Sequence, residues 1–525
     1  MSEHQIDSKL PRVSEGPAMG RRQLMVMLSS AAAAAGLPRT AWSQEQPRKG
    51  GVLRVVMPAN LSSTDPMAGN AGYDHPMLYA MFDTLIEWDY DALTAKPGLA
   101  KAWKYIDPKT LVLDLEAGVK FHDGTPLDAA AVKFNLDRSR GDQRSNVKID
   151  LASINSVDVT GPLQVTLKLK QPDTALVLIL SDRAGMMFSP KAAQSLGAGA
   201  NRTAVGSGPW KFVSWTDDEK VVVARNEAYW RPNKPHLDGI EFYIMREGAT
   251  ALRSVMSGQN DFVYNMATRQ KAVAERQKGV RAISNTTLYV HMFYLNLARP
   301  PLNDVRVRRA MNLAIDRDAF NKVTQAGIGE PATSLLPKAH WAHDPTLGEF
   351  YRYDPAQARK LLTEAGFPDG VELHIIGWTD QNSIQRQELL IDQMGKAGFR
   401  LKFENNALAT SMFSEGKGHA YLAAFTGRPD PSQIYQTIFA KDSFLNPGKA
   451  DPAAGRAEAQ VQSQAVESLA DRKVALAKLQ RMVAEAGLYV PLVVQYDVQV
   501  MAEKVMGYKP NLLGKPKFEN VWLKA

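Results

Sequence analysis

The chain of 525 residues contains no cysteine. This absence excludes disulfide bonds, thiolate nucleophiles, cysteine-ligated zinc, iron–sulfur clusters and a lipid anchor attached through cysteine. Beyond the N-terminal region the sequence also lacks low-complexity segments and a repeat of fixed period, which argues against a solenoid. The 63 basic and 55 acidic residues give a formal charge of +8. Because the basic residues are spread along the chain, they indicate a basic surface and not a nucleic-acid site.

Motifs for enzymatic chemistry are also missing. The sequence contains no H-E-x-x-H, G-x-x-x-x-G-K-[ST], G-x-S-x-G or G-x-G-x-x-G pattern, so the common metalloprotease, nucleotide and hydrolase signatures are absent. The glycine turn at residues 206–209 ends in Pro209, which removes an amide donor that a phosphate would need. His122 and Asp123 resemble an acid–base dyad, but the following Gly124 favours a turn. We therefore predict no catalytic residue and no enzyme.

The N-terminus has the pattern of a targeting segment. Arg21 and Arg22 precede a weakly apolar, alanine-rich stretch at residues 24–37, which is too short to span a membrane. Small residues flank Trp42 in an A-x-A-like pattern, so we expect cleavage before Gln44. The paired arginines favour twin-arginine export, with an ordinary Sec signal as the alternative. Either route predicts an exported protein, and without a lipid anchor we expect it in a periplasm.

Strand and helix patterns alternate through the rest of the chain. Residues 52–57 and 165–169 have strand character, and residues 490–501 predict a last strand near the end. A helix is predicted after Asp304, whose apolar positions follow the 3.6-residue period. Asp354, followed by proline and then by Gly366, marks both ends of another helix. The alternation predicts large α/β lobes.

Several blocks of sequence occur together in an order that is typical of one known family. The blocks are residues 97–138, with the run Gly118-Val119-Lys120-Phe121-His122-Asp123-Gly124-Thr125-Pro126-Leu127, and residues 205–230, 296–317, 354–367 and 491–508. Together they resemble the extracellular solute-binding proteins of ABC importers, in the peptide- and nickel-binding class known as family 5. The resemblance covers essentially the whole chain after the targeting segment.

The resemblance implies an α/β fold of the two-lobed periplasmic binding protein type, type II-like with an extra subdomain. An interlobe ligand cleft and hinge strands belong to this fold, and we expect the crossings near residues 289–293 and 490–494. The implied segments are 1–43 as signal peptide, 44–83 as the first part of lobe I, 84–205 as the extra subdomain, 206–290 as the second part of lobe I, 291–492 as lobe II and 493–525 as the C-terminal part of lobe I.

The resemblance also implies the function. Such a protein captures a small solute by hinge closure and delivers it to a membrane permease that works with an ATPase. It would do so as a monomer, with no cofactor, metal or nucleic acid. Peptide binders of this class tend to place an acid shortly before an Asp-Pro pair, but this chain has Arg428 before Asp430 and Pro431. We therefore expect a solute with a carboxylate or another anion.

Six residues are candidates for ligand binding. Tyr73 and Asp74 match a ligand-facing position of the family, and one of Phe293 and Tyr294 at the first crossing should contact the solute. The Arg428 guanidinium is suited to hold a carboxylate through two hydrogen bonds. Asp430, which also shapes this loop, completes the set. The candidates are thus Tyr73, Asp74, Phe293, Tyr294, Arg428 and Asp430.

Two alternatives stay open from the sequence. A carrier of a metal complex or haem with the same fold would use His75, His419 or the pair His340 and His343. An exported envelope hydrolase is the second, although no catalytic group is apparent. The sequence does not identify the solute, because specificity in such scaffolds depends on a few cleft side chains.

Overall fold

The computed structural model describes residues 46–524 of the chain. The predicted signal peptide, residues 1–43, and the cleavage site before Gln44 lie outside the described residues. Within the described part, no helix combines the length and apolar character that a membrane crossing requires.

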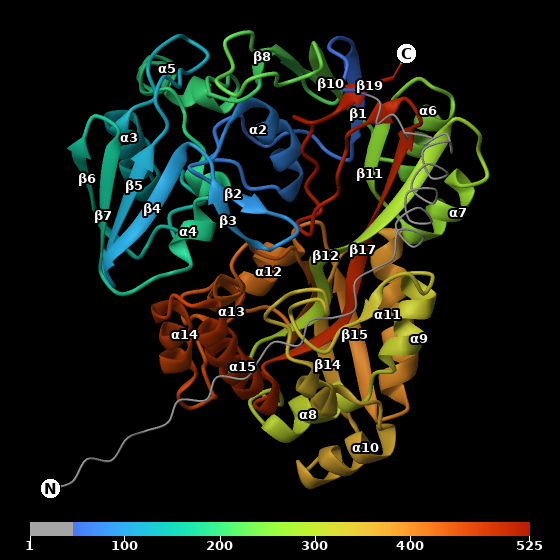
Figure 1. The fold of residues 1–525 in the computed structure, drawn as a ribbon. Helices are drawn as coiled ribbons and strands as arrows, with labels where there is room; N and C mark the ends of the chain where they lie inside the picture. Colours follow the sequence, from blue (N-terminus) through green and yellow to red (C-terminus); the bar gives the residue numbers. More distant parts are fainter. Residues whose placement is uncertain (1–45, 525) are drawn as a thin grey trace, which may run out of the picture. The chain divides into compact units, whose positions relative to one another are not determined.

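One large mixed sheet runs through the molecule (Figure 1). Its strand order is β15-β14-β16-β12-β17-β11-β1-β10-β9-β8, with β13 paired to β17. The strands are β1 (Val52–Met57), β8 (Trp210–Thr216), β9 (Lys220–Arg225), β10 (Gly239–Ile244), β11 (Phe262–Met266), β12 (Val280–Leu295), β13 (Glu330–Pro331), β14 (Val371–Gly377), β15 (Phe399–Asn405), β16 (Ala420–Phe425) and β17 (Tyr489–Ala502). The last of them confirms the strand that the sequence predicts at residues 490–501.

Strands β12 and β17 connect two separate hydrophobic cores. The first core contains β1 and β10, and we call the part of the chain around it lobe I. The second contains β14, β16 and the helices near them, and we call this part lobe II. β12 pairs with β17 in both parts, but the register shifts between Thr286 and Val290. The expected crossings near residues 289–293 and 490–494 lie beside this shift.

Lobe I contains short helices beside the large sheet. They and the small strand pair at the C-terminal end are η1 (Gly72–Asp74), α2 (His75–Met81), α5 (Pro190–Leu196), η3 (Gly197–Asn201), α6 (Gly248–Met256), η4 (Thr268–Gln270), α7 (Lys271–Ala274), β18 (Val505–Met506) and β19 (Trp522–Leu523). The helix α2 is buried throughout its length because it packs into the lobe I core.

A second sheet, in the order β4-β5-β7-β6, forms a region with its own core, which we call the extra subdomain. Its elements, with the neighbouring hairpin, are β2 (Ile86–Asp89), β3 (Thr94–Pro97), β4 (Ala100–Asp107), β5 (Thr110–Leu115), α3 (Ala129–Gly141), β6 (Ile154–Gly161), β7 (Gln164–Leu169), α4 (Leu176–Ile179) and η2 (Arg183–Gly185). The strand character of residues 165–169 is confirmed here. The segment boundaries that the sequence suggests for the lobes stay predictions.

Lobe II contains nine of the helices in the described part of the chain. They are α8 (Val305–Leu313), α9 (Arg317–Thr324), η5 (Pro345–Tyr351), α10 (Pro355–Glu364), α11 (Gln381–Gly395), α12 (Ala409–Ser414), α13 (Pro431–Phe439), α14 (Arg456–Ala465) and α15 (Leu469–Glu485). Local signals define their ends. The Asp354 side chain accepts a hydrogen bond from the Gln357 amide at the start of α10, and Gly366 follows its end with φ of +96°. Asp304 caps α8 in the same way.

Candidate functional site

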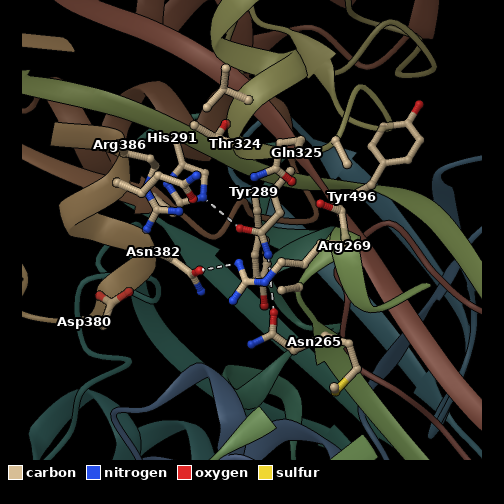
Figure 2. A pocket seen from close by; sticks show the side chains of 18 of the residues that line it. Asn265, Arg269, Tyr289, His291, Thr324, Gln325, Asp380, Asn382, Arg386 and Tyr496 are labelled. Carbon is tan, nitrogen blue, oxygen red and sulfur yellow. Dashed lines mark hydrogen bonds between the residues drawn. The ribbon is translucent and has the colours of Figure 1, made fainter. Parts of the chain in front are cut away.

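A cavity of about 380 Å³ lies between the two lobes at the hinge strands (Figure 2). We call it cavity 1. Lobe I contributes Tyr73 from η1, together with Asn265 and Arg269 from β11 and η4. The residues from β12, β17 and lobe II that matter most here are Tyr289, His291, Gln495, Asp380, Asn382 and Arg386. A cavity with walls from both lobes is the kind of cleft in which proteins bind small molecules.

Three charged side chains line cavity 1: Arg269 from lobe I, and Asp380 and Arg386 from the start of α11 in lobe II. Arg269 of lobe I donates a hydrogen bond from Nη1 to Asn382 Oδ1 of lobe II at 3.0 Å, as Figure 2 shows. Among the described residues, the Arg386 guanidinium donates a hydrogen bond to Ser383 Oγ alone, at 3.0 Å. Burial lowers the pKa of Arg386, and Asp380 nearby opposes this shift. An arginine stays protonated in proteins, so cavity 1 contains two positive charges.

Uncharged groups form a hydrogen-bonded chain across the hinge. His291 Nε2 lies 2.7 Å from Gln495 Oε1, and burial lowers the pKa of His291 to about 3. The imidazole is therefore neutral and donates from Nε2 to this oxygen. Gln495 Nε2 in turn donates to Asn265 Oδ1 at 3.3 Å, and Asn265 Nδ2 donates to the Tyr73 hydroxyl at 3.3 Å. The chain orients polar groups from both lobes toward one cavity.

A second cavity of about 150 Å³ adjoins the first through the shared residue Thr426. We call it cavity 2. Lys515 Nζ lies 3.0 Å from His75 Nε2 and 3.3 Å from Asp182 Oδ2, while His75 Nε2 lies 2.6 Å from Asp182 Oδ1. Burial lowers the pKa of Lys515 to about 8 and that of His75 to about 4. The charges of Lys515 and Asp182 therefore compensate each other within the protein.

Arg428 lies on the lobe II side of cavity 2 and is placed differently. Its Nη1 donates to the carbonyl oxygen of Gly427 at 2.8 Å, and its guanidinium lies over the Phe425 ring, 5.3 Å from the centroid. Among the residues that the structure describes, no carboxylate oxygen lies within 4.0 Å of it. This positive charge is therefore available to a solute.

A third cavity of about 200 Å³ continues the cleft between the extra subdomain and lobe II. We call it cavity 3. It shares Asp150, Ile179 and Gln433 with cavity 2. Gln433 Nε2 of lobe II donates to Asp150 Oδ1 of the extra subdomain at 2.8 Å, so this pair forms a wall between the two cavities. The cleft thus extends from the hinge to the extra subdomain.

The structure brings two of the six candidate residues to cavity walls. Tyr73 lines cavity 1 and Arg428 lines cavity 2. Asp74, the next residue, is buried, and its carboxylate accepts hydrogen bonds from the Ser62 amide, the Ser62 hydroxyl and the Ala71 amide. Its visible role is to fix the loop that carries Tyr73.

The other three candidates lie in the interior of lobe II. Phe293 is 0% exposed, and Tyr294 stacks on Tyr421 with ring centroids 5.6 Å apart. Asp430 is also 0% exposed: it caps α13 and forms an ion pair with Arg472 at 2.7 Å. None of the three lines cavities 1 to 3. Ligand binding by the six candidates stays a prediction.

Sequence reasoning missed Arg269, Asn382 and Arg386. A signal was present for two of them, because a polar run from residue 379 onward follows strand β14 and begins a helix capped by Asp380. Side chains at the start of a helix that follows a strand often face a ligand site. No comparable signal marks Arg269, which reaches the cavity only because β11 lies next to β17 in the large sheet.

The histidines of the metal-carrier alternative have other contacts. His419 Nδ1 accepts a hydrogen bond from the His374 amide at 2.8 Å. His340 Nδ1 accepts from the Ala342 amide at 3.1 Å, and His343 Nδ1 donates to a carbonyl oxygen at 3.1 Å. Residues 46–524 contain no group of three or more histidine, cysteine or acidic side chains arranged to hold a metal ion.

Two lobes joined by hinge strands, with a cleft between them, define the class of two-lobed binding proteins. Residues 94–446, well over half of the chain, match the family described as bacterial extracellular solute-binding proteins, family 5 Middle. The chain therefore belongs to family 5 of the extracellular solute-binding proteins, as the sequence resemblance implies.

Individual relatives agree with this assignment. The glutathione-binding protein GsiB of Salmonella paratyphi A is 30% identical over 341 residues, which cover 64% of this chain and 65% of the relative. The Helicobacter pylori periplasmic binding protein DppA, solved with the peptide STSA, has a TM-score of 0.81 at 22% identity, covering 91% of this chain and 99% of its own. AgaA of A. tumefaciens R10, solved with agropinic acid, has a TM-score of 0.80 at 20% identity, covering 90% and 99%. The last two similarities confirm the two-lobed fold.

Proposed function

We propose that this protein is the solute-binding component of an ABC importer. It captures a small solute between its lobes and delivers it to a membrane permease that works with an ATPase. Family membership and a cleft with walls from both lobes support this proposal. The protein performs no chemistry on the solute, and it acts as a monomer in the periplasm after removal of residues 1–43.

The solute in this proposal is peptide-like or otherwise carries a carboxylate. The position of Arg428 supports a carboxylate on the solute, because its guanidinium lies on a cavity wall without an ion pair among the described residues. A guanidinium binds a carboxylate through two parallel hydrogen bonds. The names of the relatives support the same chemistry, since glutathione, peptides and agropinic acid all carry carboxylic acid groups.

Hinge closure provides the mechanism. Lobe I, the part of the chain around the core with β1 and β10, moves against lobe II about the irregular pairing of β12 with β17. The sequence assigns segments 44–83, 206–290 and 493–525 to it. Polar contacts between the two sides, such as Arg269 with Asn382 and Gln433 with Asp150, exist only when the lobes meet. A solute that contacts both walls favours the closed state by its difference in affinity for the two states.

Native mass spectrometry of the protein purified from its own host tests the proposal, because a co-purifying solute adds its mass to the chain. Small-angle scattering with and without that solute then measures closure. We expect a carboxylate-bearing solute and a smaller radius of gyration when it is bound. Chemical turnover of a bound compound, or a radius that no bound solute changes, would contradict the proposal.

A further inference from the structure

We propose that the solute carries two separate anionic groups, one held by Arg386 and Arg269 in cavity 1 and the other by Arg428 in cavity 2. The inference rests on the proposed import function and makes its substrate class more specific. It places an acidic group at each side of Thr426, the residue at which the two cavities meet. The sequence predicts only the Arg428 contact.

Cavity 1 contains more positive charge than its own groups neutralise. In the described part of the chain, neither Arg386 nor Arg269 has a carboxylate oxygen within 4.0 Å. Each makes one side-chain hydrogen bond, although a guanidinium has five N–H donors. The carboxylate of Asp380 interacts electrostatically with Arg386, but its hydrogen bonds come from the amide and the hydroxyl of Ser383, at 3.0 and 2.6 Å. The free donors of Arg386 and Arg269 therefore suit an anion that enters from the cavity.

The cationic side chains of cavity 2 are of two kinds: those with a carboxylate oxygen within 4.0 Å and those without one. Lys515 forms an ion pair with Asp182, and Arg183 Nη1 lies 3.6 Å from Asp74. Lys515 therefore has a hydrogen-bonded partner in the protein, and the charge of Arg183 is compensated by Asp74 although the two side chains are too far apart for a hydrogen bond. Within residues 46–524, the guanidinium of Arg428, on the opposite wall, has the Gly427 carbonyl oxygen as its single hydrogen-bond acceptor. It is therefore the positive group of cavity 2 that a second anion would neutralise.

Besides the two anionic groups, the carboxylate of Asp150 favours a positively charged group on the solute. It lines cavities 2 and 3 and accepts a hydrogen bond from Gln433, but within residues 46–524 no cationic nitrogen lies within 4.0 Å of it. Burial raises the pKa of Asp150, and Arg428 opposes that shift. An ammonium group on the solute would stabilise this carboxylate. The cleft therefore fits a molecule with two carboxylates and one amine, because unpaired charges in a closed cleft are costly.

The test uses two matched pairs of probes in isothermal titration calorimetry. Glutathione is compared with its glycyl monoethyl ester, and the dipeptide Glu–Ala is compared with Gln–Ala, which has the same shape and one acid fewer. The variants are Arg386→Gln and Arg428→Gln. Arg359→Gln, on the exposed face of α10, serves as the charge-matched control.

We expect at least one diacid to bind about 10- to 100-fold more tightly than its matched monoacid, the range for a charged hydrogen-bonded contact. Arg386→Gln or Arg428→Gln should remove that preference, while Arg359→Gln keeps it. Equal binding of diacid and monoacid, a preference that survives in both variants, or no binding of any probe would overturn the inference. None of these results contradicts import itself, which the mass of a co-purified solute and the change in radius test independently.

Discussion

Cationic side chains line both cavity 1 and cavity 2, but only some of them have a carboxylate partner within the described protein. In cavity 2, Lys515 is held by Asp182, a residue 333 positions away in the sequence. In cavity 1, Arg386 makes one hydrogen bond to a serine of its own helix and no ion pair with another described residue. The comparison separates two kinds of buried charge. A charge with a partner stabilises the fold, whereas a charge without one is available to a ligand.

The largest effect on stability should come from removing the carboxylate that pairs with Lys515 and His75 in cavity 2. Asp182→Asn leaves Lys515 and His75 without their carboxylate in a buried site, so we expect a loss of about 3–5 kcal/mol of unfolding free energy. Urea unfolding measures it. Asp380→Asn in cavity 1 is the matched control: asparagine also caps a helix well, so we expect a change below about 1 kcal/mol. Equal losses in the two variants would contradict the distinction between paired and unpaired groups.

An intermediate effect should depend on pH through His291 of cavity 1. Its pKa is lowered to about 3 by burial, with Arg386 acting in the same direction and Gln495 and Asp380 opposing. Between pH 6.5 and 3 the unfolded state binds a proton that the folded state does not, so stability falls as the pH falls. At about 1.4 kcal/mol per pH unit, the contribution lost between pH 6.5 and 5.0 is about 2 kcal/mol.

Urea unfolding of wild type and His291→Gln at several pH values isolates this contribution. The glutamine variant should lose less stability on acidification than wild type. Buried Asp497, whose pKa is raised to about 7, contributes with the opposite sign in both proteins and cancels from the difference. Parallel pH profiles for the two proteins would show that His291 does not titrate as described.

Local signals in the sequence predicted elements well, because a helix cap acts over three or four residues. The predicted helix after Asp354 and the last strand at residues 490–501 are both present. Tyr73 and Arg428 reach the cleft as expected. Phe293 does not, because it lies further along β12 than the cavity residues Tyr289 and His291, where its side chain packs into the lobe II core.

The paired and unpaired charges could not be distinguished from the sequence. Whether an arginine has a carboxylate beside it depends on contacts between distant segments. The Arg269 hydrogen bond to Asn382 spans 113 positions, and the Lys515 contact with Asp182 joins lobe I to the extra subdomain. Such contacts follow from the packing of the lobes, which no local pattern encodes.

The smallest effect on solute affinity should come from a contact that involves no charged side chain, between the extra subdomain and lobe II. Thr174 of the extra subdomain donates from its amide to the Gln464 carbonyl oxygen at 2.8 Å, and its hydroxyl lies 3.0 Å from the same oxygen and 3.2 Å from that of Val466. These bonds join the extra subdomain to lobe II, and the Thr174 side chain lies outside cavities 1 to 3. Thr174→Val preserves shape and removes the hydroxyl bond, which is worth about 1 kcal/mol.

The loss should appear as about 5-fold weaker binding of the co-purified solute, because the closed state becomes less favourable relative to the open one. Calorimetry measures the affinity, and Thr363→Val, on the exposed face of α10, is the control. Charge preference should be unchanged in Thr174→Val, since every cavity arginine is intact. A variant that altered the diacid preference would show that closure and charge recognition are not separable, whereas unchanged affinity would mean that the charged groups alone control closure.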